Sequence, residues 1–339
     1  MAENSEEDLP SATECEALCK RFSEVTTANS IEAQMFLQDN DWCLERSIQS
    51  YFSSEETLPS AKVESVINSD VTKNDTTVNL PGNCHEISLL TWNLDGLDDV
   101  SLVARTRAAI KLINNECTDI VFLQEVVAIS WDIIQRDTQM LYHSIKACSD
   151  SRYFTAVLLK KGTVLLDKQE VKPFPLSTMS RKLQIVSANV KGVDIKLLTS
   201  HLESTAAHAA ERLRQFRMCM NEITGTSPNV NVIFGGDLNL GARDLTYVTL
   251  PVGLVDVWEA TGSIPEKKYT WDMKYNNNKQ MTGGATPRCR FDRVFFKAAN
   301  NNQVQPTEFH LKGLERVQDC SRFPSDHWGI LCKFHINPE

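Results

Sequence analysis

The sequence predicts an α/β protein in which two packed β-sheets flanked by helices follow a small three-helix bundle. Three observations lead to this fold class. Residues 11–53 contain three helix-start signals, residues 54–84 are polar and poor in aromatic side chains, and short apolar runs recur from residue 85 onwards. Many strands with few helical stretches between them favour two packed sheets over a regular alternation of strand and helix. We therefore divide the chain into a bundle at 1–53, a flexible linker at 54–84 and a larger domain at 85–339.

The N-terminal bundle is predicted by cap residues that precede apolar residues at helical spacing. Residues 11–14, Ser-Ala-Thr-Glu, fit a capping box, and Asn29 with Glu32 repeats that signal before a second helix. Asp41 is a cap for the third helix. The apolar positions that these helices would bury are Leu18, Phe22, Val25, Ile31, Phe36, Leu37, Leu44, Ile48, Tyr51 and Phe52. Because about 40 residues is near the lower limit for a self-standing core, we expect the helices to pack tightly.

The larger domain is dominated by apolar runs of strand length. These runs occupy residues 87–92, 120–123, 154–159, 164–166, 183–190, 195–199, 230–234, 291–296 and 329–334. Helical patterns lie between some of them, near residues 101–115, 129–147 and 204–224. The segment 54–84 that precedes this domain is rich in Ser, Thr, Asn, Glu and Asp, which is the composition of a flexible linker.

The charge is distributed unevenly along the chain. The formal net charge is -9, but residues 1–84 hold 16 acidic and 5 basic residues, a balance of -11. Residues 85–339 therefore hold 28 acidic and 30 basic residues, a balance of +2. If several of these later acids surround a metal ion, the remaining surface is basic enough to meet a phosphate backbone. The composition thus permits a nucleic-acid substrate.

Cysteine usage and the N-terminus indicate an intracellular protein. The ten cysteines form no pair with zinc-like spacing, and most lie inside apolar runs, which indicates reduced thiols in the cytosol or nucleus. The acidic start, MAENSEEDLP, lacks the basic and apolar regions of a signal peptide. No apolar run is longer than a strand, so we expect no membrane insertion.

Five short polar motifs fall at the ends or starts of predicted strands. Each places ionisable or amide side chains directly beside a run that must be buried. They are Thr-Trp-Asn-Leu-Asp-Gly at 91–96, Leu-Gln-Glu at 123–125, Thr-Ser-His-Leu-Glu-Ser at 199–204, Gly-Gly-Asp-Leu-Asn at 235–239 and Pro-Ser-Asp-His-Trp-Gly at 324–329. Residues two apart in an extended segment share a face, as Asn93 and Asp95 do, and likewise Asp237 and Asn239. A single motif of this kind is usually a turn or a surface pair, whereas five together indicate a catalytic centre.

The order and spacing of these motifs resemble the endonuclease/exonuclease/phosphatase superfamily, whose members have the DNase I-like fold. The resemblance covers residues 85–337 and implies an αββα sandwich. Within the superfamily the chain is most similar to the branch that removes trapped topoisomerase II from 5′ DNA ends. The residues that carry this similarity are 199–205, 269–272 (Tyr-Thr-Trp-Asp), 290–293 (Arg-Phe-Asp-Arg) and 322–329.

Hydrolysis of a phosphodiester needs a hard cation, a base for water and donors for the non-bridging oxygens. Glu125 is the best candidate metal ligand, with Asp95 as a second contact, because carboxylates and water suit Mg²⁺. Mn²⁺ is an alternative metal. Asp237 would take the proton from the attacking water, and Asn239 would orient that water or bind phosphate.

The remaining residues of the centre are assigned to the phosphate. His327 would donate to a non-bridging oxygen, with Asp326 holding its ring, and Asn93 would help to place the metal and the phosphate. After Asp-Leu-Asn-Leu at 237–240 the related enzymes continue with Arg-Asp, whereas Gly241 and Ala242 intervene here before Arg243. Arg243 is therefore a candidate, and not an assured, phosphate contact.

The family resemblance also implies which residues line the groove for a DNA strand. They are Tyr153, His201, Ser204, Trp271 and Phe291. Aromatic rings in such a groove would stack on unpaired bases or sugars. Phe291 has an alternative interpretation as an ordinary core residue.

The N-terminal segment resembles a ubiquitin-associated (UBA) domain, on Phe36-Leu37 and on residues 41–48 before Tyr51. This resemblance implies that residues 11–53 bind ubiquitin. The chain departs from the ubiquitin-binding pattern after the first helix, where Glu-Val-Thr-Thr at 24–27 replaces a Met-Gly-Phe-type loop. A bundle that packs on some other surface is the alternative.

The resemblances together predict Mg²⁺-dependent hydrolysis of the 5′-phosphotyrosyl bond that links topoisomerase II remnants to DNA ends. The product would be a 5′-phosphate for double-strand break repair. The expected partners are DNA 5′ ends that carry a covalent tyrosine or peptide, topoisomerase II adducts, and ubiquitin. Such a substrate implies a nuclear location, with the cytoplasm as a second one.

Two other functions remain open at this point. One is a different nuclease or phosphatase of the same superfamily, such as an RNA deadenylase-like enzyme. The other is a ubiquitin-binding adaptor with an inactive nuclease-like domain. The complete set Asn93, Glu125, Asp237, Asn239 and His327 argues against the adaptor, because a decayed site should have lost at least one of them.

Overall fold

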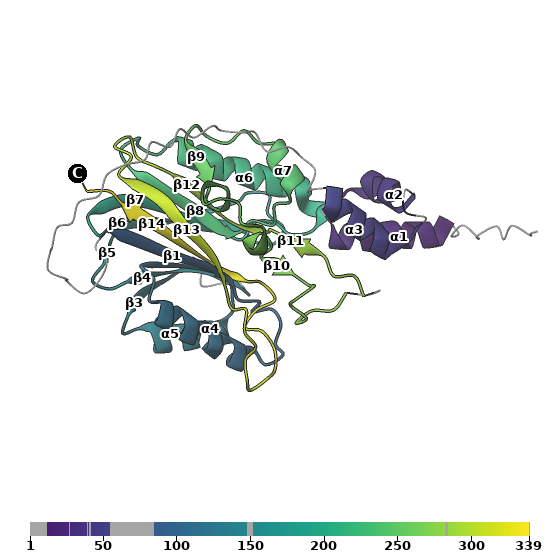
Figure 1. Ribbon diagram of the computed structural model, residues 1–339, viewed down its shortest axis with the longest axis horizontal. Coiled ribbons are helices and arrows are strands. Elements are labelled where there is room, and N and C mark those ends of the chain that lie inside the picture. Colours follow the sequence, from purple (N-terminus) through teal and green to yellow (C-terminus); the bar gives the residue numbers. More distant parts are fainter. Residues whose placement is uncertain are drawn as a thin grey trace, which may run out of the picture.

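The computed structural model describes residues 12–26, 28–38, 40, 42–54, 85–147, 152–281 and 284–338. Ser11 and Asp41, expected to cap helices, and residues 55–84 of the predicted linker lie outside this part of the chain. Figure 1 shows a small helical bundle beside a larger domain in which helices cover two sheets.

The bundle consists of α1 (Ala12–Val25), α2 (Ser30–Gln38) and α3 (Leu44–Ser54). The predicted capping box before α2 is present: the backbone N of Asn29 donates to Glu32 (3.0 Å), and the backbone N of Glu32 donates to Asn29 (3.0 Å). The core of the bundle comprises Phe22, Ala28, Ala33, Leu37, Leu44, Ile48 and Tyr51. Helical spacing of apolar residues thus gave the packing of this bundle correctly.

The first sheet has the strand order β13-β14-β1-β2-β4-β3. Its strands are β1 (Glu86–Asn93), β2 (Ile120–Val126), β3 (Tyr142–Lys146), β4 (Phe154–Lys160), β13 (Val304–Lys312) and β14 (Gly329–Ile336). β1 and β2 are parallel, and β14 is antiparallel to β1. The helices α4 (Leu102–Glu116) and α5 (Ala128–Thr138) cover its outer face.

The second sheet has the strand order β5-β6-β7-β8-β12-β9. Its strands are β5 (Val164–Pro173), β6 (Lys182–Val190), β7 (Val193–Ser200), β8 (Asn231–Asp237), β9 (Leu254–Asp256) and β12 (Asp292–Lys297). β7 and β8 are parallel, and β12 is antiparallel to β8. Helix α6 (Ala209–Thr224) packs on its outer face, and the short helices α7 (Ala242–Thr246) and α8 (Val257–Ala260) follow β8 and β9.

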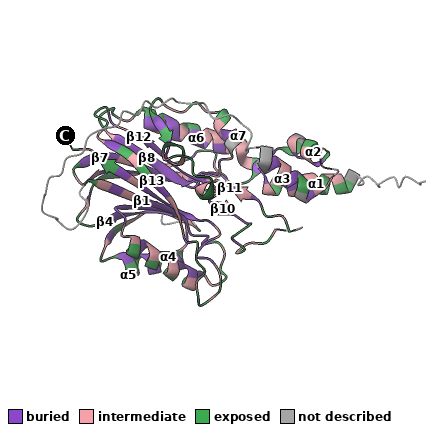
Figure 2. Ribbon diagram, viewed as in Figure 1, coloured by how far each residue is buried: buried purple, intermediate pink, exposed green. Residues whose placement is uncertain are grey.

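Three apolar cores hold the layers together, as the buried faces in Figure 2 show. The central core joins the two sheets, with Leu89 and Phe122 from one and Val186 and Ile195 from the other. A second core packs α4 and α5 on the first sheet, and a third packs α6 on the second sheet. The predicted fold class, two packed sheets flanked by helices and preceded by a three-helix bundle, is confirmed.

One predicted element is wrong. The pattern at residues 129–147 predicted a single helix, but α5 ends at Thr138 and β3 begins at Tyr142. Tyr142 is buried and pairs with Lys160 of β4, so sheet pairing overrides the local helical pattern.

The cysteines and the helices bear on two further expectations from the sequence. Among the described residues the cysteines are thiols and not disulfides. In the same part of the chain, no helix combines the length and apolar character required to cross a membrane.

Candidate active site

The candidate active site lies at one edge of the sandwich, where strands of both sheets end. β1 and β2 end there in one sheet, and β7 and β8 end there in the other. Because β14 and β12 run antiparallel to β1 and β8, both of them begin at this edge. The five polar motifs follow or precede these strands, so the topology brings them together. A hydrogen bond from Nδ2 of Asn93 to Oδ2 of Asp237 (2.9 Å) joins the two sheets at this point.

Two glycines let the loops at this edge pack closely. A side chain on Gly96 would collide with the main-chain oxygen of Glu125, and one on Gly236 would collide with the main-chain oxygen of Ser200. Gly236 also has a φ of 145°, which residues with side chains rarely adopt. Each glycine therefore holds the end of one strand against the end of its neighbour.

Three motif residues have a left-handed backbone although none of them is glycine. The φ angles of Asp95, Glu125 and Asn239 are 49°, 51° and 50°. Such conformations persist only where the surrounding structure enforces them, and they cluster at functional sites. Here they turn the chain directly after a buried strand, so that the polar side chains reach the centre.

Asp237 lies in the middle of the site and is 2% exposed. Its Oδ2 lies 3.2 Å from Nε2 of His201 and 3.8 Å from Nε2 of His327, and Asn239 donates its backbone N–H to Oδ1 (3.1 Å). Burial raises the pKa of this carboxyl, but His201 and His327 together lower it by more, so the pKa lies below its ordinary value. Asp237 is therefore ionised and is positioned to accept a proton.

Asn93 and Asn239 hold the loops around this carboxylate. Besides its bond to Asp237, Asn93 accepts the backbone N–H of Asp95 at 2.9 Å. Asn239 donates from Nδ2 to the carbonyl of Leu202 (3.2 Å), which ties the end of β8 to the segment after β7.

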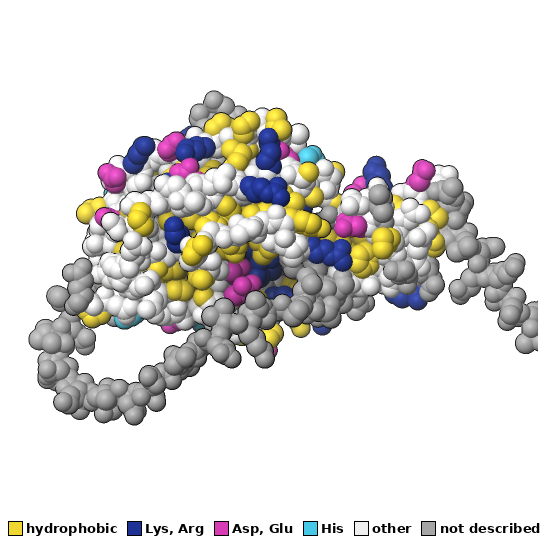
Figure 3. Space-filling model, turned by 90° about the horizontal axis from the view of Figure 1, so that it is seen from above, with side chains coloured by type: hydrophobic (Ala, Val, Ile, Leu, Met, Phe, Trp, Pro, Cys, Tyr) yellow, Lys and Arg dark blue, Asp and Glu magenta, His cyan; other side chains and the backbone are white. Residues whose placement is uncertain are grey.

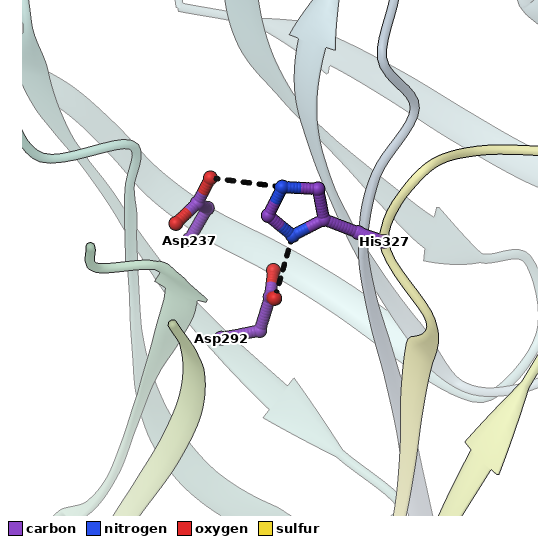
Figure 4. A group of neighbouring side chains, drawn as sticks. All are labelled: Asp237, Asp292 and His327. Atoms are coloured by element: carbon purple, nitrogen blue, oxygen red, sulfur yellow. Dashed lines mark hydrogen bonds and ion pairs between the residues drawn. The ribbon is translucent and has the colours of Figure 1, made fainter. Parts of the chain in front are cut away.

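His327 is oriented by Asp292, as Figure 4 shows. Nδ1 of His327 lies 2.7 Å from Oδ2 of Asp292, which begins β12 directly opposite Asp237 in the β8–β12 pair. The expectation that Asp326 holds this ring is wrong, because Oδ2 of Asp326 instead accepts a hydrogen bond from Nε1 of Trp271 (3.1 Å). The carboxylate that contacts the ring of His327 is therefore not the one next to it in the sequence.

The two histidines of the site are in opposite protonation states. Burial lowers the pKa of His327, but Asp292 and Asp237 raise it by more, so its pKa lies well above the ordinary value and the ring is charged. Burial and the nearby Arg181 lower the pKa of His201 to about 4, so that ring is neutral. A cationic donor and a neutral imidazole therefore flank the same carboxylate.

A second group of carboxylates lies beside the first. Burial and the charges of Asp326 and Asp95 raise the pKa of Glu125 to about 7. Burial and Asp326 raise the pKa of Asp95 to about 6, although Lys279 and Arg105 oppose this. Oδ2 of Asp95 is a buried oxygen without a hydrogen-bond partner. Crowded acids with raised pKa values form a site that a cation would stabilise.

Two groups of residues are thus candidates for a metal ion. Asp237, Asp292 and His327 lie within ligating distance of one another. However, His327 carries a proton on the atom that faces Asp292, so this group is already neutralised by an internal cation. Glu125 and Asp95 offer carboxylate oxygens, which are the hard ligands that Mg²⁺ prefers. Their raised pKa values indicate that the groups around them do not fully compensate their negative charges. The residues present therefore fit a magnesium ion at Glu125 and Asp95.

Two cations already contact Asp95. Nζ of Lys279 lies 2.9 Å from Oδ1 of Asp95 and 3.1 Å from Asp98, and Arg322 pairs with Asp98 at 2.7 Å. Arg105, fully buried, lies 3.7 Å from Oδ2 of Asp95 and donates to the carbonyl of Pro324 (3.2 Å). These contacts tie the loop after β1 to the loop before β14.

A pocket beside Glu125 and His201 is lined by Tyr153 and Arg181. The guanidinium of Arg181 lies over the Tyr153 ring at 5.0 Å and donates to Ser204 at 3.0 Å. Its Nε and Nη1 are buried without hydrogen-bond partners. Arg181 therefore offers free donors at the place where an anionic substrate would enter.

Trp271 and Phe291 form an aromatic ledge on the other side of the centre. Their rings lie 5.6 Å apart, and both residues are half-buried. Trp271 begins β10 (Trp271–Asp272), which pairs with β11 (Arg288–Cys289) and forms a bridge to His327. Phe291 is thus less buried than the residues of the apolar cores, which favours its assignment to the ledge.

Arg243 lies outside this constellation. Its guanidinium lies over the rings of Phe36 and Tyr51 in the N-terminal bundle, at 5.2 Å and 4.9 Å. The structure thus brings together the predicted residues of the centre and the ledge, and directs Arg243 to the bundle.

Sequence reasoning missed three residues at the site: Arg181, Lys279 and Asp292. Asp292 belongs to the Arg-Phe-Asp-Arg segment at the start of a strand, so the same rule that selected the other motifs applied to it. Arg181 and Lys279 lie in loops without a recognisable motif, and only the folded chain places them at the centre.

Comparisons with known proteins agree with this geometry. The endonuclease/exonuclease/phosphatase family matches residues 90–327, and a UBA-like domain matches residues 16–57. Tyrosyl-DNA phosphodiesterase 2 of Homo sapiens is 38% identical over 350 residues, which cover 98% of this chain and 95% of that protein.

Solved structures match the larger part of the chain or nearly all of it. The crystal structure of D. rerio TDP2 with single strand DNA product has a TM-score of 0.70 and 37% identity, and covers 74% of this chain and 99% of that chain. The crystal structure of TDP2 from C. elegans has a TM-score of 0.69 and 32% identity, and covers 99% of this chain and 97% of that chain.

Proposed function

Because this chain belongs to the endonuclease/exonuclease/phosphatase family, as a phosphodiesterase of the tyrosyl-DNA phosphodiesterase 2 type, we propose that it cleaves 5′-phosphotyrosyl bonds at DNA ends. The tyrosine would belong to topoisomerase II remnants, and the product would be a 5′-phosphate available for double-strand break repair. Mg²⁺ would be the metal, with Mn²⁺ as the alternative.

The observation that carries this proposal is the set of groups around Asp237. An ionised carboxylate lies between a neutral and a charged histidine, next to Glu125 and Asp95, whose pKa values are raised. This arrangement supplies a base, a cationic donor and a metal site within one buried cluster, which are the three requirements for hydrolysis of a phosphodiester.

Asp237 would accept a proton from a water molecule as the water oxygen bonds to phosphorus. Asn93, which donates to Oδ2 of Asp237, and Asn239, which donates to Oδ1, restrict the orientation of this carboxylate. The bond from phosphorus to the tyrosine oxygen breaks, and the tyrosine leaves as a phenolate, a good leaving group because the pKa of tyrosine is about 10.

His327 would stabilise the charge that develops on a non-bridging oxygen. Its ring remains charged because Asp292 binds the opposite nitrogen, so Nε2–H is directed at the centre. A metal ion held by Glu125 and Asp95 would neutralise phosphate charge in the same step. Arg181 would donate to the phosphate from the pocket side through the nitrogens that lack partners.

The ledge of Trp271 and Phe291 would hold the nucleic-acid strand. Stacking of a base or sugar on an aromatic ring does not depend on sequence, as an enzyme that acts on any DNA end requires. The site must also admit a peptide chain on the tyrosine side.

A comparison of three substrates tests this function. The enzyme should release tyrosine from a 5′-phosphotyrosyl oligonucleotide far faster than it shortens an RNA with a 3′ adenosine tail or hydrolyses a soluble phosphomonoester. Preferential shortening of the RNA would assign the site to a deadenylase, and preferential hydrolysis of the monoester would assign it to a phosphatase.

The N-terminal bundle would bind ubiquitin, in keeping with the UBA-like match. Ubiquitin on the protein part of an adduct would then raise the local concentration of substrate. A nuclear location, with the cytoplasm as a second one, follows from the substrate and is tested by imaging of the tagged protein.

A further inference from the structure

The larger domain contacts the N-terminal bundle through Arg243, whose charged side chain lies on aromatic residues of the bundle. The guanidinium of Arg243 lies over Phe36 of α2 and Tyr51 of α3, and Nη1 lies 4.0 Å from Oε1 of Glu32. A cation over two aromatic faces with an acid beside it is a matched set of contacts, because each ring face carries negative potential.

Arg243 is presented by a helix that the larger domain holds firmly. The neighbouring Asp244 is buried, accepts the backbone N–H of Gly241 at 3.0 Å, and lies 3.4 Å from the fully buried Arg212. The start of α7 is thus fixed by an internal ion pair of Asp244, while the side chain of the preceding Arg243 lies on the bundle.

The bundle needs an outside contact to cover its core. It has about 40 residues, near the size below which a core seldom stands alone. Tyr51 is only 1% exposed, and its ring lies under Arg243; Ala285 of the larger domain also packs against the core of the bundle. Separation of the two parts would therefore expose aromatic rings that the structure buries.

The contact lies beside the catalytic groove. Helix α1 contacts η2 (Ala206–His208), which begins two residues after Ser204, and α7 follows the Gly-Gly-Asp-Leu-Asn motif. Figure 1 shows α3 of the bundle beside α7, and the space-filling view in Figure 3 shows the bundle against one end of the larger domain.

We propose that the larger domain carries a docking surface for its own N-terminal bundle, with Arg243 as the central contact. The bundle is held at a fixed place beside the candidate active site. A ligand of the bundle is therefore held at a defined distance from the catalytic centre. This inference does not rest on the identity of the substrate.

The test uses the full chain and compares wild type with Arg243→Ala. Arg217→Ala is the matched control, because Arg217 hydrogen-bonds the carbonyl of Tyr247 at the end of α7 without a contact to the bundle. Small-angle X-ray scattering gives the maximum dimension of the particle, and hydrogen exchange gives the protection of α2, α3 and η2.

Arg243→Ala should increase the maximum dimension and speed exchange in α2, α3 and η2 about tenfold or more, while Arg217→Ala should match wild type. Arg243→Lys, which keeps the charge but lacks the planar group, should lie between them and serves as the test if Arg243→Ala fails to fold. Unchanged scattering and exchange in folded Arg243→Ala would overturn the proposal. A raised KM for substrate with unchanged scattering would assign Arg243 to phosphate instead.

Discussion

At the scale of single residues, the site contains carboxyl groups whose pKa values the fold shifts in opposite directions. Asp237 stays ionised because His201 and His327 oppose the effect of burial. Glu125 and Asp95 hold protons to a higher pH than usual because other acids surround them. The charge of Asp237 is thus compensated by groups of the protein, whereas Glu125 and Asp95 keep raised pKa values even though Lys279 and Arg105 lie beside Asp95.

The raised pKa values predict how the metal-free protein responds to pH. The ordinary pKa values are 4.5 for Glu125 and 3.8 for Asp95, against about 7 and about 6 in the folded protein. The folded state therefore keeps protons that the unfolded chain has released, so this contribution to stability is present at low pH and is lost as pH rises through 6 to 7. In Glu125→Gln, the decrease in Tm between pH 5.5 and pH 8 should be smaller than in wild type.

The same variant tests the metal site without an activity assay. Millimolar Mg²⁺ at pH 8 should raise the Tm of wild type, since an ion that binds only the folded state stabilises it. It should not raise the Tm of Glu125→Gln, and that variant should have almost no hydrolytic activity. An equal increase in Tm for both proteins would place the metal elsewhere, with Asp237, Asp292 and His327 as the remaining group.

Another prediction concerns which aspartate orients His327. Removal of the negative charge in Asp292→Asn should lower kcat about a hundredfold or more, because the charged imidazole loses its partner. The alkaline limb of the pH profile of kcat should also move to lower pH, since the pKa of His327 falls.

Asp326→Asn is the matched comparison, because Asp326 contacts Trp271 and not the His327 ring. Its alkaline limb should move less than that of Asp292→Asn, because Asp326 raises the pKa of His327 through its charge alone and by less than Asp292 does. A shift in Asp326→Asn with none in Asp292→Asn would contradict the geometry of the site.

The residues of the centre were largely predictable because each one follows or precedes a buried strand. Asn93, Glu125, Asp237 and His327 could be selected for that reason alone. The partner of His327 could not, because the adjacent Asp326 offers the simplest pairing and only the β8–β12 register places Asp292 opposite Asp237. Arg181 depends on a loop that Glu203 holds through bonds to Ser177, Thr178 and Met179, and these contacts leave no local motif.

At the scale of elements, the proposed function assigns to the short β10–β11 hairpin the distinction between a strand of nucleic acid and a small phosphoester. It presents Trp271 beside Phe291 and ties it to Asp326. Trp271→Ala should raise the KM for phosphotyrosyl DNA several-fold or more, as loss of one stacking contact costs about 1–3 kcal/mol. Turnover of a minimal nitrophenyl phosphodiester, which does not reach the ledge, should barely change.

Two controls separate the roles of this residue. Trp271→Phe keeps a ring but removes the hydrogen bond to Asp326, so it should retain most of the affinity for DNA if stacking dominates. Asp237→Asn should greatly lower the turnover of both substrates, because Asp237 acts on the chemical step that they share. If Trp271→Ala impairs both substrates equally, the residue supports the catalytic centre and does not form a ledge for DNA.

The apolar runs of the sequence predicted most of the strands. They did not predict strands that form because of pairing with a neighbouring strand and not because of their own sequence. β3 was hidden in a helical pattern. β13 was not predicted, because Pro306 interrupts it and it lies at the edge of the first sheet, where a bulge follows that proline. Neither strand contributes a residue to the site, so the catalytic residues could be chosen without them.

At the scale of the whole molecule, the sequence separates a bundle from a catalytic domain and the structure brings them into contact. Deletion of residues 1–84 should leave kcat/KM on a short 5′-phosphotyrosyl oligonucleotide within about twofold of wild type, because every residue of the centre lies beyond the deletion. A folded truncated protein that has lost most of its activity would show that the bundle is part of the active site.

The docking contact could not be anticipated from either part alone. The UBA-like pattern identified Phe36 and Tyr51 as apolar positions of a bundle, and the family motif suggested a phosphate contact for Arg243. The cation–π contacts between them join residues about 200 positions apart and are worth about 0.5–2 kcal/mol. Such pairings depend on how two folded units meet.

The central claim is that a water molecule activated at Asp237 attacks the phosphorus of a 5′-phosphotyrosyl DNA end. Hydrolysis of a 5′-phosphotyrosyl oligonucleotide in ¹⁸O-labelled water, with Mg²⁺ and then with a chelator, tests it most directly. We predict that labelled oxygen enters the 5′-phosphate, that the released tyrosine stays unlabelled, and that both the chelator and Asp237→Asn abolish the reaction. Label in the tyrosine, or full activity in the chelator or in Asp237→Asn, would contradict the account.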